Sequence, residues 1–146
     1  MTMKTREFLA QLRHDEIVAA IGAAELKTSG EIRVFVSHRR LDDPMAAARR
    51  AFEKLGMTRT RERNGVLIFV APRAQAFAVL GDSGVHERCG DSFWQQLAAE
   101  LSEHFRQSQF TEGVVQAVAK AGELLAQHFP RQADDRNELP DAVAHD

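Results

Sequence analysis

An apolar run of six residues, Val66–Ala71, limits the fold of this chain more than any other feature of the sequence. A strand of this composition has no side chain to turn toward water, so it is expected in the middle of a layered α/β domain, covered on both faces. A second apolar run, Ala76–Gly81, follows after only the four residues Pro72–Gln75. So short a connection permits only an antiparallel hairpin, and the two runs are predicted to pair in that way.

A strand and a helix are predicted ahead of this hairpin. Residues Glu31–Ser37 alternate aliphatic with other side chains, which is typical of a strand with one drier face. Asp43 and Pro44 supply a helix cap and a first helical residue, and an apolar stripe continues to Leu55. Strand, helix and strand in this order form a right-handed βαβ unit with parallel strands, so the whole sheet is expected to be mixed.

Three further segments have the spacing of amphipathic helices. Apolar residues recur about every 3.6 positions in Thr5–Lys27 (with a break or bend near His14–Asp15), in Ser92–Gln107 and in Glu112–Phe129. Asp91 and Thr111 are predicted to cap the last two helices, and Pro130 to end the third. These elements predict one α/β domain over residues 1–130. It is a three-layer α/β/α sandwich, with a mixed sheet built from the βαβ unit and the β-hairpin, and two long C-terminal helices.

The segment 131–146 differs in composition from the rest of the chain. It contains five acidic and two basic residues, and it has almost nothing to bury. A segment that buries little apolar surface gains too little to offset the entropy of ordering. We therefore expect an acidic, flexible or loosely docked C-terminal tail.

Composition and charge argue against several classes of protein. The formal net charge of −2 is not that of a nucleic-acid-binding domain, which normally carries a basic excess. Cys89 is the single cysteine, so no intrachain disulfide can form, and this fits a reducing compartment. The first residues are charged and amphipathic, without an apolar run suited to a signal peptide or membrane anchor. A cytoplasmic protein with no integral membrane segment is the expectation.

A candidate metal site follows from the predicted hairpin. Asn64 precedes the first strand of the hairpin, and Asp82 and Asp91 follow the second. Because the strands are antiparallel, the start of one and the end of the other should meet at the same edge of the sheet. Asn64, Asp82, Glu87 and Asp91 could then supply oxygen ligands for calcium or magnesium. The alternative stays open that the first two belong to ordinary turns and that Asp91 only caps a helix.

A candidate phosphate site lies just before Asn64. Arg59, Arg61 and Arg63 alternate along the loop that leads into the strand, and guanidinium groups suit phosphate oxygens. The alternative is that these arginines belong to a solvated loop.

Two weaker hypotheses concern the segment after the hairpin. His86 and Cys89 have the spacing of a zinc pair, although no second pair of ligands lies nearby in the sequence. Cys89 also lies beside Arg88 at a predicted helix start, where a cation and a helix N-terminus would favour the thiolate. No histidine and acid pair is apparent that would make this thiol a nucleophile.

Several stretches of the sequence resemble the TPM domain family, named after a plant thylakoid lumen protein, a photosystem II repair protein and a nematode receptor-associated protein. The stretches are RNGVLIFVAP, FAVLGDSGVHE, the helix start DSFW and the closing HFPRQADDRNELPD. The resemblance runs from about Gly30 to Pro140. It implies an α/β/α sandwich, phosphatase activity, and a divalent metal, calcium in particular, held by acidic residues in loops at one end of the sheet.

Individual positions of the family can be placed on this sequence. The acidic or amide residue before the family's Gly-Val-Leu strand falls on Asn64, its loop glycine on Gly84 and its helix-opening aspartate on Asp91. The chain departs from the family where His86 and Glu87 stand in place of a common Glu-Gly, and where Asn64 is neutral.

Two functions follow as hypotheses. The first is a binding module for an unidentified protein partner or a phosphate-containing ligand, with a divalent-metal site. The second is a metal-dependent phosphatase that hydrolyses phosphomonoesters, with Asn64, Asp82 and Asp91 at the metal and the arginine loop at the phosphate. The first is favoured, because the sequence has neither a thiol nucleophile within a glycine-rich arginine cradle nor a dense cluster of aspartates and histidines.

Overall fold

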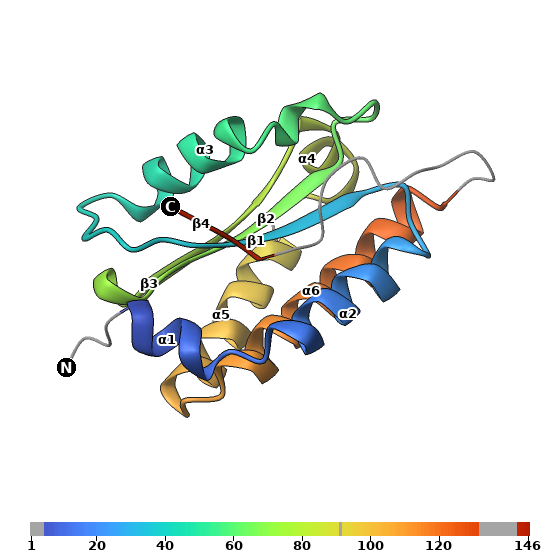
Figure 1. Cartoon of the computed structure of the whole chain (residues 1–146). Coiled ribbons are helices and arrows are strands. Elements are labelled where there is room, and N and C mark those ends of the chain that lie inside the picture. Colours follow the sequence, from blue (N-terminus) through green and yellow to red (C-terminus); the bar gives the residue numbers. More distant parts are fainter. Residues whose placement is uncertain (1–4, 91, 132–142) are drawn as a thin grey trace.

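A four-stranded mixed sheet lies between two layers of helices (Figure 1). The structure, a computed structural model, describes residues 5–90, 92–131 and 143–146 of the 146-residue chain. The strands are β1 (Glu31–Val36), β2 (Gly65–Ala71), β3 (Ala76–Gly81) and β4 (Ala144–His145), in the spatial order β3-β2-β1-β4. The predicted three-layer α/β/α sandwich is confirmed.

The βαβ unit and the hairpin both form as predicted. β1 and β2 are parallel, with Ile32 opposite Val66, and the helix α3 (Pro44–Lys54) connects them. Asp43 caps α3, because its carboxylate accepts a hydrogen bond of 3.1 Å from the backbone N–H of Ala46. β2 and β3 are antiparallel and are joined by a short 3₁₀ turn, Pro72–Ala74.

The apolar run of β2 is buried on both faces, which is why no polar residue interrupts it. Val66, Ile68 and Val70 pack with the helices α1 (Thr5–Gln11), α2 (His14–Glu25), α5 (Ser92–Arg106) and α6 (Phe110–His128). Leu67, Phe69 and Ala71 pack on the other face with α3. Figure 1 shows α3 on one side of the sheet and α2, α5 and α6 on the other. Each large side chain buried in this way stabilises the fold by about 1.5–3 kcal/mol.

A short helix, α4 (Ser83–Cys89), occupies most of the segment predicted to be a loop. Asp82 is its N-cap, and its carboxylate accepts a hydrogen bond of 2.7 Å from the backbone N–H of Ser83. Gly84 lies against the preceding loop, where a β-carbon would overlap the carbonyl oxygens of Glu62 and Arg63. The glycine that the family resemblance places in a loop is therefore needed for this close approach of two backbones.

The N-terminal helical segment is broken as the sequence indicated, but one predicted cap is wrong. α1 ends at Gln11 and α2 begins at His14. α6 begins at Phe110, directly after Gln109, so Thr111 is already inside the helix. The Thr111 hydroxyl instead accepts a hydrogen bond of 3.0 Å from the backbone N–H of Arg13, which ties α6 to the break between α1 and α2.

The end of the acidic segment adds a strand to the sheet. β4 pairs in parallel with β1, with Ala144 opposite Phe35 and His145 opposite Val36. Residues 132–142 lie outside the described residues, so the predicted flexibility of the tail stays a prediction for them. No helix in the described ranges is both long enough and apolar enough to cross a membrane.

Candidate functional site

The two loops predicted to meet at one edge of the sheet do so. Asp82 donates its backbone N–H to the carbonyl oxygen of Gly65 at 2.9 Å, and Gly84 donates to the carbonyl oxygen of Arg63 at 2.9 Å. The antiparallel hairpin thus brings the residues around Asn64 beside those around Asp82. Asp91 lies outside the described residues, and its place in this site stays a prediction.

Asp82 and Arg63 form a two-point ion pair at this edge. The Nε of Arg63 donates to Oδ2 of Asp82 at 2.7 Å, and its Nη2 donates to Oδ1 at 2.9 Å. The side chain of Asp82 is only 6% exposed. The hydrogen bonds that Arg63 donates to the Asp82 carboxylate, and then the charge of that carboxylate, raise the pKa of Arg63 above the ordinary arginine value. A residue predicted to bind metal and a residue predicted to bind phosphate therefore neutralise each other.

Asn64 is buried beside this pair and has one unused polar atom. Its Nδ2 donates to the Ser29 hydroxyl at 3.1 Å and reaches the Glu62 carboxylate at 3.5 Å. Its Oδ1 is buried and has no hydrogen-bond partner among the described residues. A buried amide oxygen without a hydrogen bond lowers the stability of the fold unless a ligand binds it. This oxygen is therefore a candidate ligand-binding atom.

The remaining predicted ligands do not complete a metal site in the described part of the chain. Glu87 is exposed on α4, and Arg59 and Arg61 are exposed on the loop before Asn64. A hard cation takes six to eight oxygens, whereas both carboxylate oxygens of Asp82 are engaged by Arg63. Among residues 5–90, 92–131 and 143–146, no group of three His, Cys, Asp or Glu side chains is placed to hold a metal ion. As arranged, these residues do not fit a bound cation, and the four-residue metal site stays a prediction.

The hypothesis of an activated thiolate at Cys89 is wrong. Cys89 ends α4 instead of beginning a helix, so the helix dipole opposes the thiolate there. Burial raises the pKa of Cys89 above the ordinary thiol value, and the charge of Arg88 lowers it by less.

A groove of about 570 Å³ extends from the Arg63–Asp82 pair along β3. It lies between α3 and α5, and the consecutive residues Phe77–Gly81 line it together with Trp94. We call it the β3 groove. Trp94 is 7% exposed, and its Nε1 is buried without a hydrogen-bond partner among the described residues. The groove thus combines an apolar wall, an unused buried donor and a charged end.

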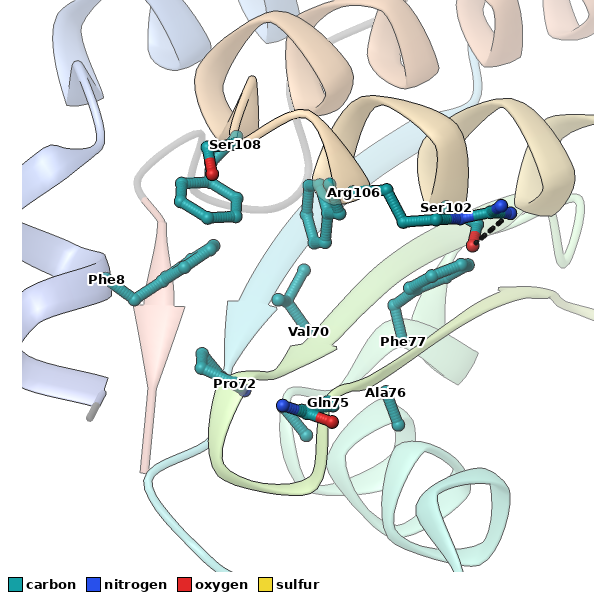
Figure 2. Close-up of a pocket in the computed structure, with 12 residues that line it drawn as sticks. Phe8, Val70, Pro72, Gln75, Ala76, Phe77, Ser102, Arg106 and Ser108 are labelled. Atoms are coloured by element: carbon teal, nitrogen blue, oxygen red, sulfur yellow. Dashed lines mark hydrogen bonds between the residues drawn. The ribbon is translucent and has the colours of Figure 1, made fainter. Parts of the chain in front are cut away.

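A second hollow, of about 470 Å³, adjoins the β3 groove at the hairpin end of the sheet (Figure 2). Four phenylalanines line it, with neighbouring ring centroids 5.0–5.9 Å apart: Phe8, Phe77, Phe105 and Phe110. We call it the aromatic pocket. Figure 2 shows Gln75 at its hairpin side and Arg106 at its α5 side. Phe77 lines both hollows, so they form one continuous surface along β3.

Neither hollow is visible in the amino-acid sequence. Phe8, Phe105 and Phe110, on α1, α5 and α6, follow ordinary helix spacing, and Phe77 follows the strand pattern. The structure shows the difference between the two strands of the hairpin in the burial of β3. Its residues are mostly half-buried whereas those of β2 are all buried, as expected for a strand at the edge of the sheet.

Known proteins were compared with this chain by sequence and by structure. Residues 3–124 match the family model described as the TPM domain. A search of curated proteins found no match. Among solved structures, the chain is similar to the NMR structure of the BA42 protein from the psychrophilic bacterium Bizionia argentinensis, with 37% sequence identity and a TM-score of 0.85. The match covers 93% of this chain and 96% of that one. The chain belongs to the TPM domain family.

Proposed function

We propose that this TPM domain is a protein-binding module whose partner lies along β3. The observation that carries the proposal is the continuity of the surface, because Phe77 lines both the β3 groove and the aromatic pocket. The surface runs from the Arg63–Asp82 pair at one end of β3 to the hairpin at the other. Its length and shape suit an extended polypeptide better than a compact small molecule.

The backbone of β3 supports binding by strand addition. In the order of the described strands, β3 is at the edge of the sheet. Asp82 pairs with Gly65 through its backbone N–H, and hydrogen-bonded residues alternate along an antiparallel pair. Phe77, Val79 and Gly81 therefore direct their N–H and C=O groups away from β2. An edge of this kind is a template on which an extended segment of another protein can pair.

The aromatic pocket supports the same proposal by offering a place for an anchor residue. Phe77, Phe105 and Phe110 are half-buried, so their rings still present apolar surface to the pocket. Large side chains that fill such pockets carry most of the binding energy in many protein interfaces. A partner strand on β3 would place one apolar side chain here.

Site-specific photo-crosslinking in the host cell tests the proposal. A photoreactive residue is introduced at Gln95 in the β3 groove or at Ser102 in the aromatic pocket, and Ala19 on the exposed face of α2 serves as the matched control. The proposal predicts one and the same protein adduct from Gln95 and Ser102, and none of it from Ala19. Equal yields of that adduct from all three positions would show that the β3 surface is not the binding site.

A metal-dependent phosphatase is the second proposal. It is favoured by the unused buried Oδ1 of Asn64 and by the position of Arg63 at the mouth of the β3 groove, where a guanidinium could bind a phosphate ester. It requires Arg63 to release Asp82. Titration calorimetry with calcium and magnesium, followed by a chromogenic phosphomonoester assay, tests it. Metal-dependent turnover that is lost in Asp82→Asn and in Asp91→Ala would favour this proposal over the first. Turnover that neither substitution changes would remove these residues from the reaction.

A further inference from the structure

We propose that the end of β1 and the cationic pocket beside it form a docking site for an extended acidic segment of a partner protein. The chain's own residues Val143–Asp146 occupy this site, and they would compete with the partner segment for it. The proposal concerns the side of the sheet opposite β3, and it does not depend on the proposed function of the β3 surface.

The site already holds an extended segment that ends in a carboxylate. Beyond the two residues that pair with β1, the Asp146 carboxylate is bound by the loop that follows that strand. It accepts hydrogen bonds of 2.6 Å from the Ser37 hydroxyl and 2.6 Å from the backbone N–H of His38. Arg39 places its Nε 3.7 Å from the same carboxylate, whose side chain is 14% exposed. In these contacts the loop after β1 binds an acidic side chain that directly follows a strand paired with β1.

Among the described residues, the pocket beside Asp146 is lined by more positive than negative side chains. The pocket measures about 210 Å³, and Arg39, Arg50 and Lys54 line it. Asp146 is the only acidic side chain among its described lining residues. Neither Arg50 nor Lys54 forms an ion pair with any residue that the structure describes. The charge that remains favours a ligand with more than one acidic side chain, and therefore a partner segment more acidic than Val143–Asp146.

In the described residues, the backbone pairing of the present occupant is short. β4 comprises Ala144–His145 there, whereas strands in globular proteins usually have three to ten residues. A segment attached to the same chain competes at an effective concentration in the millimolar range, so weak pairing is enough to keep it in place. A more acidic strand from another protein could displace it, because that strand would gain further ion pairs with Arg50 and Lys54.

The pairing of β4 with β1 indicates which position of a competing strand should carry a second acidic residue. Ala144 packs against the core between β1 and α3, which is the face that carries Arg50 and Lys54. Asp146 lines the pocket on this face as well. A glutamate in place of Ala144 in a competing strand would bring a second carboxylate to the unneutralised cations.

The test uses the full-length chain and a fluorescent synthetic peptide with the sequence of residues 138–146. The substitution Asp146→Asn in the chain weakens the binding of the chain's own segment Val143–Asp146 to the site. Circular dichroism checks that this variant is folded. The proposal predicts that the variant binds the peptide about tenfold more tightly than the wild-type chain does, as measured by fluorescence anisotropy. Failure of the folded variant to bind the peptide better than the wild-type chain would overturn the proposal.

A second peptide tests the charge argument. The peptide with Ala144→Glu is predicted to bind the Asp146→Asn chain about two- to fivefold more tightly than the original peptide, the gain expected of an exposed ion pair. Adding Arg50→Gln and Lys54→Gln to the chain should abolish this gain. A gain that persists without these cations, or no gain at all, would contradict the proposed preference for an acidic strand. The chain variant Ala19→Ser, on the exposed face of α2, should bind both peptides unchanged.

Discussion

Arg63 and Asp82 lie 19 residues apart in the sequence and form a two-point ion pair at the edge of the sheet where β2 begins and β3 ends. The pair closes one end of the β3 groove, and Asp82 also caps α4. One carboxylate thus joins the loop before β2, the end of β3 and the helix that follows.

The two roles of Asp82 can be separated by two substitutions. Asp82→Asn removes the charge but keeps an oxygen that can cap α4, whereas Asp82→Ala removes both. We expect Asp82→Ala to lower the free energy of unfolding by about 0.5–2 kcal/mol more than Asp82→Asn does, which is the usual contribution of an N-cap. Urea denaturation of the two variants measures the difference. Equal losses would mean that the cap contributes nothing.

Gly84 should tolerate no side chain. A β-carbon there would overlap the carbonyl oxygens of Glu62 and Arg63, so Gly84→Ala is expected to lower the free energy of unfolding by about 1–3 kcal/mol through overpacking. Gly90→Ala is the matched control, because Gly90 has a φ of +74° but no atom within 4 Å of the added carbon. The control should show only the backbone strain of a positive φ combined with a ψ of −174°, about 1–3 kcal/mol. Crystal structures of both variants should show a displaced Arg63 loop only for Gly84→Ala.

Side chains on the face of the sheet that α3 covers should stabilise the fold as much as side chains buried elsewhere in the core. Leu67 is fully buried on that face, and Leu67→Ala is expected to lower the free energy of unfolding by about 2–5 kcal/mol. Leu26 is 72% exposed, so Leu26→Ala should change it by less than about 0.5 kcal/mol. Thermal or urea denaturation gives both values. A small effect of Leu67→Ala would be inconsistent with a third layer over β2.

The docking of β4 should weaken in acid. Burial raises the pKa of Asp146, but hydrogen bonds from the His38 amide, the Ser37 hydroxyl and the His38 ring, with the charge of Arg39, together lower it below the ordinary value. Because the folded pKa is lower than the unfolded value of about 3.9, the stabilisation is present above that pH and is lost as the pH falls through the folded pKa. The NMR chemical shift of the His38 backbone amide, followed as the pH falls through the folded pKa of Asp146, measures this loss of docking. In Asp146→Asn the same amide should show no such transition.

The sequence was sufficient to predict the parts of the fold that depend on local pattern. The uninterrupted apolar run of β2 and the four-residue connection after it determine the burial of that strand and its antiparallel pairing with β3. β4 could not be predicted, because two residues next to an acidic segment carry no strand pattern, and their pairing depends on the exposed side of β1. α4 was missed because Gly84 is a turn signal in isolation, and only the packed loop shows why a glycine stands there.

The candidate site was predicted in its location and less well in its chemistry. The hairpin argument placed Asn64 and Asp82 at one edge of the sheet, where the structure has them. It assigned Arg63 and Asp82 to different ligands, because an ion pair across 19 residues is not visible in a sequence. The β3 groove could not be predicted from the sequence either, because it is formed by helices that approach one strand from both faces of the sheet.

Proline substitution at the edge of β3 tests the central claim, which is that a partner pairs with this strand. Val79→Pro removes an N–H that points away from β2, so the ladder between the two strands keeps its hydrogen bonds, as prolines at sheet edges allow. Val79→Ala is the control. In chains that carry the photoreactive residue at Gln95, we predict that Val79→Pro abolishes the partner adduct and that Val79→Ala retains it, with both variants folded. An undiminished adduct in Val79→Pro would contradict the account.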